Sequence, residues 1–264
     1  MKSSVLHVIK IGGNIVDHPT LLAQFLTDFS AIDAPKILVH GGGKIATQFS
    51  EKMGIVPQLI DGRRITDAET LKIVTMVYGG LINKQIVAGL QARKCNAIGL
   101  TGADANIILS KKRQHPSIDF GFVGDVEQVN AGMLQHFISA GLSPIIAPLT
   151  HDGEGNILNT NADTVASTIA VAMSKIMEVK FFYCFEKKGL LLDINDNNSV
   201  LKHVQLKEIE SLKNDGTIVT GMIPKVDNIS NAIQAGVAQV VLCHAEDMAS
   251  IIAGNHSFGT IFTA

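Results

Sequence analysis

The sequence predicts an α/β fold built on a mostly parallel sheet that is covered by helices. Short apolar runs alternate with longer segments whose apolar residues recur every three or four positions, along all 264 residues. Hydrophobic residues make up 46% of the chain, enough to bury such a sheet. This alternation is typical of crossover units, because two parallel strands need a connection long enough for a helix.

The expected elements follow the chain in a regular order. Strands are expected at residues 5–11, 36–40, 96–101, 143–149, 179–185, 238–243 and 260–263. Helices are expected at residues 19–31, 44–53, 67–93, 130–141, 161–176, 205–214, 225–236 and 245–253. The polar stretch "KKRQHPSI" at 111–118 lies between apolar flanks, which predicts an antiparallel hairpin with a solvated basic loop. The best candidate for a domain boundary lies near residues 176–179.

Several predicted helices begin on residues suited to that position. Pro19 fits the first turn of a helix, where an amide hydrogen is not needed. Thr66 and Asp67 can cap the long helix that follows them, and Asn161 stands where the helix at 161–176 begins. Their side-chain oxygens can accept hydrogen bonds from the free amides of a first turn.

Charge and composition exclude several classes of protein. The chain has 22 basic and 24 acidic residues and a net charge of −2, so nothing points to a nucleic-acid or membrane surface. Apolar stretches are interrupted before the roughly 20 residues of a membrane span, and no signal peptide precedes the first strand. The three cysteines, Cys95, Cys184 and Cys243, are far apart and suit reduced thiols. We expect a cytoplasmic protein.

Glycine-rich motifs follow three of the predicted strands. They are "KIGGN" from Lys10, "HGGGK" from His40 and "TGAD" from Thr101. Ligands gather at this edge of a parallel sheet, where the amides of helix starts point outward. A lysine at the end of a buried strand needs an anionic partner, although a simple tight turn explains a lone Lys-x-Gly-Gly about equally well.

The triple glycine Gly41–Gly43 favours a ligand-binding loop over a tight turn. Glycines let the backbone approach a ligand closely and aim amides at an anion. The same letters form an oxyanion loop in some esterases, but the chain has no Gly-x-Ser-x-Gly nucleophile motif. It also has no Gly-x-Gly-x-x-Gly or P-loop motif, no His-Glu-x-x-His and no Cys-x-x-Cys, so no protein-bound metal site is predicted.

Two further polar segments are candidates for substrate binding. Arginines 63 and 64 in "DGRRIT" can clamp a carboxylate, although a surface pair is the commoner outcome. In "LNTNADTVAS", Asn159, Asn161 and Asp163 can bind a ligand or serve as ordinary caps and turn residues. Neither segment alone decides between these interpretations.

Five motifs in one order resemble the amino-acid kinase family. They are Lys10–Gly13, "VHGGGK", "GRRIT", "NTNAD" and "GMIPKV", and the similarity spans essentially the whole chain. The resemblance implies a three-layer sandwich with an open, mostly parallel eight-stranded sheet between helices. It also implies a lobe at 1–178 for the acyl-amino acid and for dimerisation, and a lobe at 179–264 for ATP.

The activity that the resemblance implies is ATP-dependent phosphorylation of the side-chain carboxylate of N-acetyl-L-glutamate, the second step of arginine biosynthesis. A carboxylate with a pKa near about 4.3 is ionised at neutral pH and needs no general base. The chemistry therefore calls for cations and amides that stabilise the transferring phosphoryl group.

Site residues are assigned by the same resemblance. Lys10 and Lys225 would be the catalytic cations, and Asp163 would hold them in place. The residues implied for substrate are Gly42, Gly43, Arg64 and Asn159, and those for ATP are Gly12, Gly13, Lys188, Gly189 and Met222. Mg²⁺ would arrive bound to ATP.

The chain departs from the family pattern in its nucleotide segments. It has "FEKKGLL" at 185–191 and Thr220–Met222 before the second lysine, so the ATP contacts depend least on the motifs. N-succinyl-L-glutamate is an alternative substrate, and a non-catalytic ligand sensor on the same fold is an alternative from another class. Carbamate, aspartate and nucleoside-monophosphate kinases open differently after the first lysine. A homodimer is expected, with the helix at 67–93 as its candidate face.

Overall fold

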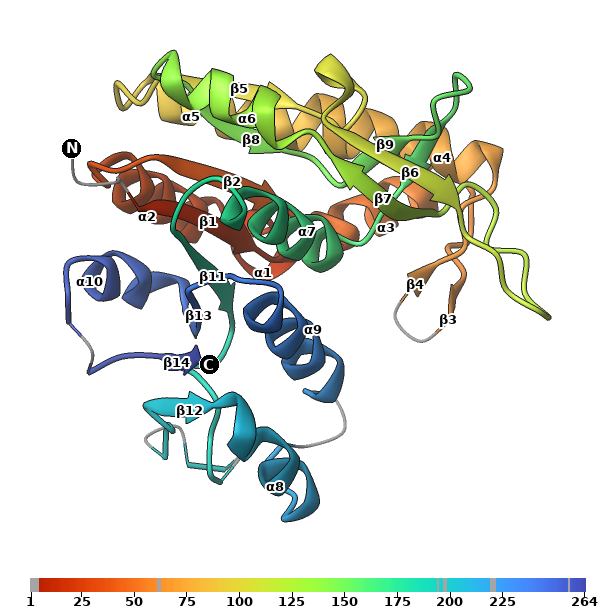
Figure 1. The fold of residues 1–264 in the computed structure, drawn as a ribbon. Helices are drawn as coiled ribbons and strands as arrows, with labels where there is room; N and C mark the ends of the chain where they lie inside the picture. Colours follow the sequence, from red (N-terminus) through yellow and green to blue (C-terminus); the bar gives the residue numbers. More distant parts are fainter. Residues whose placement is uncertain (1–4, 61–62, 194, 197–198, 219–221, 256) are drawn as a thin grey trace.

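Figure 1 shows the fold in a computed structural model, which describes residues 5–60, 63–193, 195–196, 199–218, 222–255 and 257–264. Its largest sheet has eight strands. In spatial order they are β12 (His203–Gln205), β14 (Thr260–Thr263), β13 (Gln239–His244), β11 (Val179–Phe185), β1 (Leu6–Ile11), β2 (Lys36–His40), β8 (Ser143–Ile146) and β5 (Ala97–Leu100). The seven predicted strands all belong to this sheet, and β12 is the strand that the prediction missed.

The sheet is mostly parallel, as predicted. β1 lies near its middle and pairs in parallel with β11 and β2, so that Lys10 stands between Tyr183 and Val39. The reversal comes at one side, where β14 runs antiparallel to β13 and β12 is parallel to β14. β1, β2 and β11 therefore end at the same edge of the sheet.

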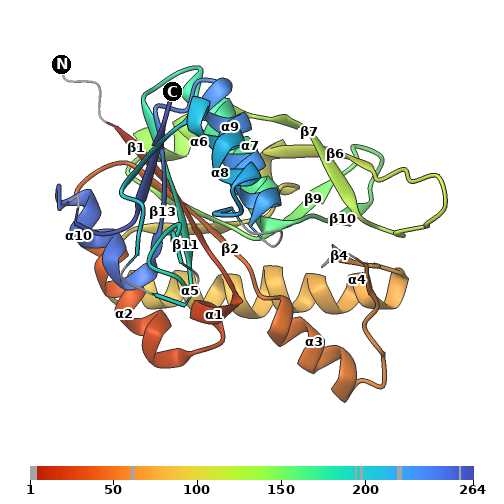
Figure 2. The ribbon, with the colours of Figure 1, turned by 90° about the horizontal axis from the view of Figure 1, so that it is seen from below.

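Helices cover both faces, which confirms the three-layer architecture (Figures 1 and 2). One face is covered by α1 (Gly13–Val16), α2 (Pro19–Ser30), α3 (Gly43–Lys52), α4 (Ala68–Val74), the π-helical segment η1 (Thr75–Ile82), α5 (Asn83–Gln91) and α10 (Met248–Ile252). The other is covered by α6 (Ala131–Ser139), α7 (Ala162–Ser174), α8 (Ile209–Asn214) and α9 (Ile223–Gln234). Short 3-10 turns occupy η2 (Asp104–Asn106), η3 (Leu206–Glu208) and η4 (Ala245–Asp247).

The predicted caps form as the side-chain chemistry suggests. The Asp67 carboxylate accepts a hydrogen bond from the Thr70 amide at 2.8 Å, at the start of α4. Asn161 accepts from the amides of Asp163 and Thr164, at 2.8 and 3.1 Å, at the start of α7. Pro19 is the first residue of α2. Local sequence therefore sets where these helices begin.

A smaller sheet carries the predicted hairpin. Its strands lie in the order β10 (Ile157–Asn159), β9 (Leu149–His151), β6 (Ile108–Lys112) and β7 (Gly124–Val129). β6 and β7 are antiparallel, as expected, and β9 continues the chain from β8 after a break at Ala147–Pro148. A two-stranded ribbon, β3 (Leu59–Ile60) with β4 (Arg63–Arg64), projects beside it.

The segment Ala68–Gln91 forms one long helix through α4, η1 and α5. Of the described residues, it alone makes a helix long and apolar enough to cross a membrane, judged by length and composition only. The same composition occurs in core helices, and its inner face here packs against the sheet through buried residues such as Ile73, Val77 and Ile86. Packing against the sheet accounts for its apolar character.

Elements that follow β11 gather in one part of the molecule, coloured blue in Figure 1. β11 itself begins at Val179 and pairs with both β1 and β13, so the large sheet continues across the predicted boundary. The assignment of 1–178 and 179–264 to different substrates stays a prediction.

Candidate active site

The centre of the candidate site is an aspartate that binds two lysines from opposite ends of the chain. Lys10 Nζ lies 2.6 Å from Asp163 Oδ1, and Lys225 Nζ lies 3.0 Å from Asp163 Oδ2. Only 11%, 19% and 27% of the Lys10, Asp163 and Lys225 side chains are exposed. Two cations thus share one anion in a partly desolvated place, which leaves a surplus positive charge for a ligand.

Different elements supply the three charges. Lys10 stands on β1 near its end, Asp163 in the first turn of α7, and Lys225 in the first turn of α9. A lysine in a first helical turn is electrostatically unfavourable beside the free amides there, unless an anion lies nearby. The position of Lys225 is therefore what an anion-binding site requires.

Asp163 is ionised in this setting. Burial raises the pKa of its carboxyl, but the neighbouring Lys10 and Lys225 charges outweigh burial and hold the pKa below its usual value. The Tyr183 hydroxyl donates a hydrogen bond to the Asp163 carbonyl at 3.3 Å, and the Lys225 ammonium lies 5.7 Å from the centre of the Tyr183 ring. The side chain of β11 thus supports the charge cluster from below.

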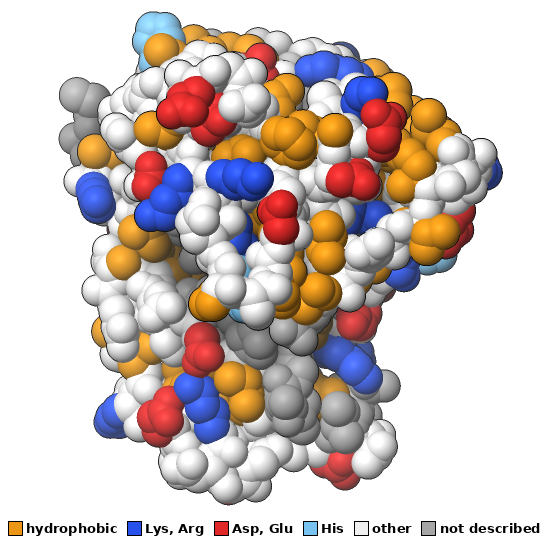
Figure 3. Space-filling view, turned by 90° about the vertical axis from the view of Figure 1, so that its right-hand side faces the viewer, with side chains coloured by type: hydrophobic (Ala, Val, Ile, Leu, Met, Phe, Trp, Pro, Cys, Tyr) orange, Lys and Arg blue, Asp and Glu red, His pale blue; other side chains and the backbone are white. Residues whose placement is uncertain are grey.

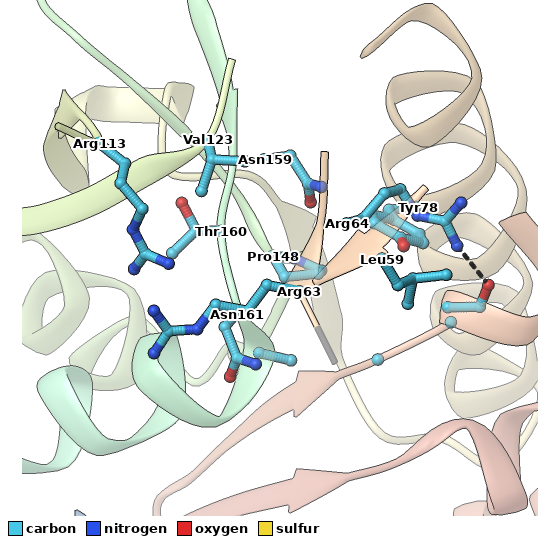
Figure 4. Close-up of a pocket in the computed structure, with 14 residues that line it drawn as sticks. Leu59, Arg63, Arg64, Tyr78, Arg113, Val123, Pro148, Asn159, Thr160 and Asn161 are labelled. Carbon is cyan, nitrogen blue, oxygen red and sulfur yellow. Dashed lines mark hydrogen bonds between the residues drawn. The ribbon is translucent and has the colours of Figure 1, made fainter. Parts of the chain in front are cut away.

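One cavity, of about 200 Å³, holds all four residues predicted to bind substrate. Gly42, Gly43, Arg64 and Asn159 line it together with Ala162, the neighbour of Asp163. Figure 4 shows this cavity. Among its described lining residues are three arginines and no acid, which suits an anionic ligand.

Gly42 fits its position because no side chain has room there. It stands at the start of α3 with φ = 157°, and an added Cβ atom would come within 2.3 Å of Ile82 Cδ1. Gly43 follows as the first helical residue, and nothing lies within 4 Å of the place of its missing Cβ. The loop between β2 and α3 can thus bring its amides close to a ligand.

Arg64 and Asn159 are both buried and both tied to neighbouring elements. The Arg64 Nη2 group donates to the Gly43 carbonyl at 3.0 Å and to Thr47 Oγ1 at 2.7 Å, so the guanidinium points toward α3 (Figure 4). Asn159 Nδ2 donates to Thr66 Oγ1 at 2.9 Å. Arg64 therefore also supports the glycine loop, a role that sequence reasoning did not assign.

Arg113 corrects the prediction that the basic run at 111–118 is a solvated loop. Its side chain is only 15% exposed, because it forms a double hydrogen bond with Asp125 and lies over Phe120. The guanidinium lines the cavity near Arg63 and Asn161 (Figure 4). Asp125, on the other strand of the hairpin, is the sequence signal that could have indicated this burial.

Arginines 63 and 64 separate for a simple geometric reason. Successive side chains of a strand point to opposite faces, and both residues belong to β4. Arg64 is buried against α3, whereas Arg63 is exposed and reaches the cavity from the other side. The two arginines of "GRRIT" consequently act at different places. Asp61 and Gly62 of that motif lie outside the described residues.

A second cavity, of about 440 Å³, adjoins Lys225 and has a mostly apolar lining. Gly189 and Met222, predicted to bind ATP, line it with Phe185, Lys187 and Leu190. Lys188 does not: it is exposed, and its charge acts on Asp247 instead. The structure thus places Lys187, rather than Lys188, where a cation could meet a nucleotide. Thr220 and Gly221 lie outside the described residues.

Gly12 and Gly13 stand beside the charge cluster. A Cβ atom on Gly12 would lie 3.6 Å from Lys10 Nζ, and Gly12 is the residue at which α1 begins. Both glycines thus leave the Lys10 ammonium open to a ligand. Among the described residues no group of three or more His, Cys, Asp or Glu side chains could hold a metal ion.

The face in Figure 3 is hollowed between a broad upper part and a narrower lower part, with basic and acidic side chains interspersed over it. The charge cluster joins the two cavities, since Ala162 lines one and Lys225 lines the other. Cations between an anion-binding cavity and a larger apolar one are suited to stabilising a phosphoryl group in transit. Fold and site together define an α/β phosphotransferase.

The chain belongs to the amino acid kinase family, whose family model matches residues 6–244. The acetylglutamate kinase of Cytophaga hutchinsonii is 57% identical over 260 residues, which is 98% of each chain. That of Bacteroides thetaiotaomicron is 56% identical over 237 residues, or 90% of this chain and 92% of its own. An archaeal acetylglutamate kinase, from Methanopyrus kandleri, is 36% identical over 92% of this chain and 96% of its own.

Solved structures share the fold at lower identity. A carbamate kinase from Giardia lamblia bound to AMP-PNP has a TM-score of 0.71 at 15% identity, and the match covers 100% of this chain and 99% of that one. An N-acetylglutamate synthase from Neisseria gonorrhoeae, complexed with coenzyme A and N-acetyl-glutamate, has a TM-score of 0.83 at 18% identity. This chain is covered to 99% but spans only 59% of the synthase chain.

Proposed function

We propose that this protein transfers the γ-phosphoryl group of ATP to the side-chain carboxylate of N-acetyl-L-glutamate. A carboxylate oxygen attacks the γ-phosphorus, the bond between that phosphorus and the β,γ-bridging oxygen breaks, and ADP leaves with the electron pair. The products are N-acetyl-L-glutamyl 5-phosphate and ADP. The observation that carries this proposal is the convergence of Lys10 and Lys225 on Asp163 between the two cavities.

Each cavity takes one substrate in this scheme. The arginine-lined cavity holds the acyl-glutamate, with Arg64 and Asn159 at its α-carboxylate and Gly42 and Gly43 offering amides. The larger cavity holds ATP against Gly189, Met222 and Lys187, and its phosphates extend toward Gly12, Gly13 and the lysines. The substrates correspond to the proposed parts 1–178 and 179–264.

Mg²⁺ enters with ATP in this proposal and bridges its phosphates. Support comes from the chemistry of the site: magnesium bound through phosphates and water needs few protein ligands. The described residues offer Lys10 and Lys225 to the phosphoryl oxygens instead.

A homodimer in the cytoplasm completes the proposal. The long helix exposes Met76 to 53% and Leu81 to 37%, and an open apolar groove beside Met76 is lined by Leu71, Phe122 and Ile157. Apolar surface of this kind suits a subunit contact. Cys95, Cys184 and Cys243 are buried, free thiols, as a reducing compartment requires.

Phosphoryl transfer is tested directly by measuring ADP release with a coupled assay. Purified protein with MgATP and N-acetyl-L-glutamate should release ADP, and hydroxylamine should trap the acyl phosphate as a hydroxamate. L-Glutamate, which lacks the acyl group, is the matched control substrate. ATP turnover that does not depend on the acyl-glutamate, or its complete absence, would reject the proposed reaction and favour the non-catalytic sensor.

Replacement of Arg64 by alanine should raise KM for the acyl-glutamate at least about 10-fold, with little change in KM for ATP, because a charge-assisted bond to the substrate carboxylate is lost. Arg64 also holds Gly43 and Thr47, so Thr47→Val is the matched control that removes one of these internal bonds alone. A larger rise in KM for ATP than for the acyl-glutamate would reject Arg64 as the carboxylate clamp.

N-Succinyl-L-glutamate is a second candidate substrate that one observation favours. Curated relatives carry the name acetylglutamate kinase, but the substrate cavity contains Arg63 and Arg113 in addition to Arg64. N-Acetyl-L-glutamate has one carboxylate besides the reacting one, whereas the succinyl compound has two. Arg113 is held in place by Asp125, with its Nη1 group buried and without a hydrogen-bond partner among the described residues.

Turnover of the two acyl-glutamates distinguishes these candidates. For an acetyl-specific enzyme, kcat/KM is higher with N-acetyl-L-glutamate, and Arg113→Gln changes it by less than about 3-fold. If the succinyl carboxylate binds Arg113, kcat/KM is higher with N-succinyl-L-glutamate and falls at least about 10-fold in Arg113→Gln. Lys111→Gln, whose side chain is 65% exposed on the same hairpin, is the control variant.

A further inference from the structure

A buried histidine stands directly before the glycine loop. His40 is the last residue of β2 and is fully buried. Its Nδ1 atom lies 2.9 Å from the Gly41 carbonyl oxygen, and its Nε2 atom lies 3.2 Å from Asn83 Nδ2. The imidazole thus connects the first peptide of the loop to the long helix.

The partners of His40 determine its tautomer. A carbonyl oxygen only accepts hydrogen bonds, so Nδ1 carries the hydrogen and donates to Gly41. The Asn83 amide group then donates to Nε2, and the same group donates to the Ile145 carbonyl at 2.9 Å. Burial lowers the pKa of His40 to about 4, so the ring is neutral at physiological pH, as this arrangement needs.

Asn83 is itself held tightly from several sides. Its Oδ1 atom accepts from Lys84 Nζ at 3.2 Å, and an added Cβ atom on Gly99 would come within 2.0 Å of the same oxygen. The residue before it, Ile82, is the one that fills the space beside Gly42. One point on the long helix, where η1 becomes α5, therefore contacts both His40 and the glycine loop.

The loop is fixed at both ends of one residue. The Gly41 amide donates to the Ile11 carbonyl at 2.9 Å, which ties the loop to the strand that carries Lys10. The Gly41 carbonyl accepts from His40 on the other side. With both groups of Gly41 bound, the peptides that follow have little freedom to rotate before α3 begins at Gly43.

We propose that His40 and Asn83 are positioning residues that set the orientation of the Gly42 and Gly43 amides toward the substrate. This inference rests on the proposed function, in which those amides bind the acyl-glutamate. His40 touches no reacting atom. It acts through Gly41, and Asn83 acts by holding the ring in the tautomer that donates to Gly41.

Two substitutions separate the two ring nitrogens. In His40→Asn the side-chain amide can replace Nδ1 and still donate to Gly41, whereas in His40→Gln the longer side chain reaches Asn83 in place of Nε2. We expect kcat/KM for the acyl-glutamate to stay within about 3-fold in His40→Asn and to fall at least about 30-fold in His40→Gln. A merely structural role would lower Tm in both variants and leave the turnover of the folded fraction unchanged.

Hydrogen exchange of the Gly41–Gly43 amides, measured by NMR in the free protein, is the readout independent of activity. Exchange should accelerate at least about 10-fold in His40→Gln and stay near wild type in His40→Asn. If His40→Gln does not fold, Asn83→Ala should show the faster exchange with a roughly 5-fold loss of kcat/KM. Unchanged exchange in the folded variants would overturn the inference. An inactive wild-type protein whose loop responds as expected would instead reject the proposed function alone.

Discussion

Replacement of Lys10 or Lys225 by alanine is expected to lower turnover at least about 100-fold, with a smaller change in KM for either substrate. Both ammonium groups converge on Asp163, where negative charge develops on the transferring phosphoryl oxygens in the proposed reaction. A charge that stabilises the transition state more than the bound substrates lowers kcat when it is removed.

Steady-state kinetics of both variants measure this effect. Lys72→Ala is a suitable control, because Lys72 forms a surface pair with Glu69 and is 66% exposed, far from the cluster in environment. Its turnover should match wild type. Unchanged turnover in Lys10→Ala or Lys225→Ala would remove that lysine from the catalytic assignment.

Asp163→Asn should give the second large effect, a fall in turnover of about 10- to 100-fold together with a loss of stability. The substitution keeps the size of the side chain but leaves Lys10 and Lys225 without their shared anion, so the two ammonium groups repel each other. Loss of one partner from a buried ion pair costs on the order of 3 kcal/mol. Asn161 still caps α7, so the helix itself should persist.

The pH dependence of this stability loss follows from the lowered pKa of Asp163. A carboxyl whose pKa is lower in the folded than in the unfolded state stabilises the fold above the unfolded pKa, and the contribution disappears as pH falls through the folded pKa. Denaturant titrations should thus show a constant difference between wild type and Asp163→Asn from about pH 5 upward. The difference should shrink only in stronger acid. A difference that vanishes near neutral pH would contradict the assigned ion pairs.

Much of the fold could be predicted because local chemistry and long-range packing agree. The seven expected strands all joined the large sheet, and Asp67 and Asn161 cap the helices expected of them. β12 was missed since it is three residues long, a length at which period-two alternation carries no signal. The π-helical turn of η1 was missed because its cause is tertiary, in the packing of Ile82 against Gly42.

The candidate site was predictable where a motif carries its own chemistry. Lys10, Asp163 and Lys225 lie together, and Gly42, Gly43, Arg64 and Asn159 line one cavity. Side-chain direction was not predictable. Lys187 and Lys188 are adjacent in sequence, yet only Lys187 lines the larger cavity, and Arg113 is buried because a partner strand places Asp125 beside it. Such facts depend on pairing that no single segment encodes.

The sharing of one carboxylate by two ammonium groups has a further consequence for how the resting protein behaves. Lys10 is contributed by β1 and Lys225 by α9, so Asp163 acts as a removable stand-in for the phosphate that the lysines would otherwise repel one another without. An arriving phosphoryl group can take over part of its contacts without any charge having to be buried anew. The free protein is therefore already organised as though its anion were half present.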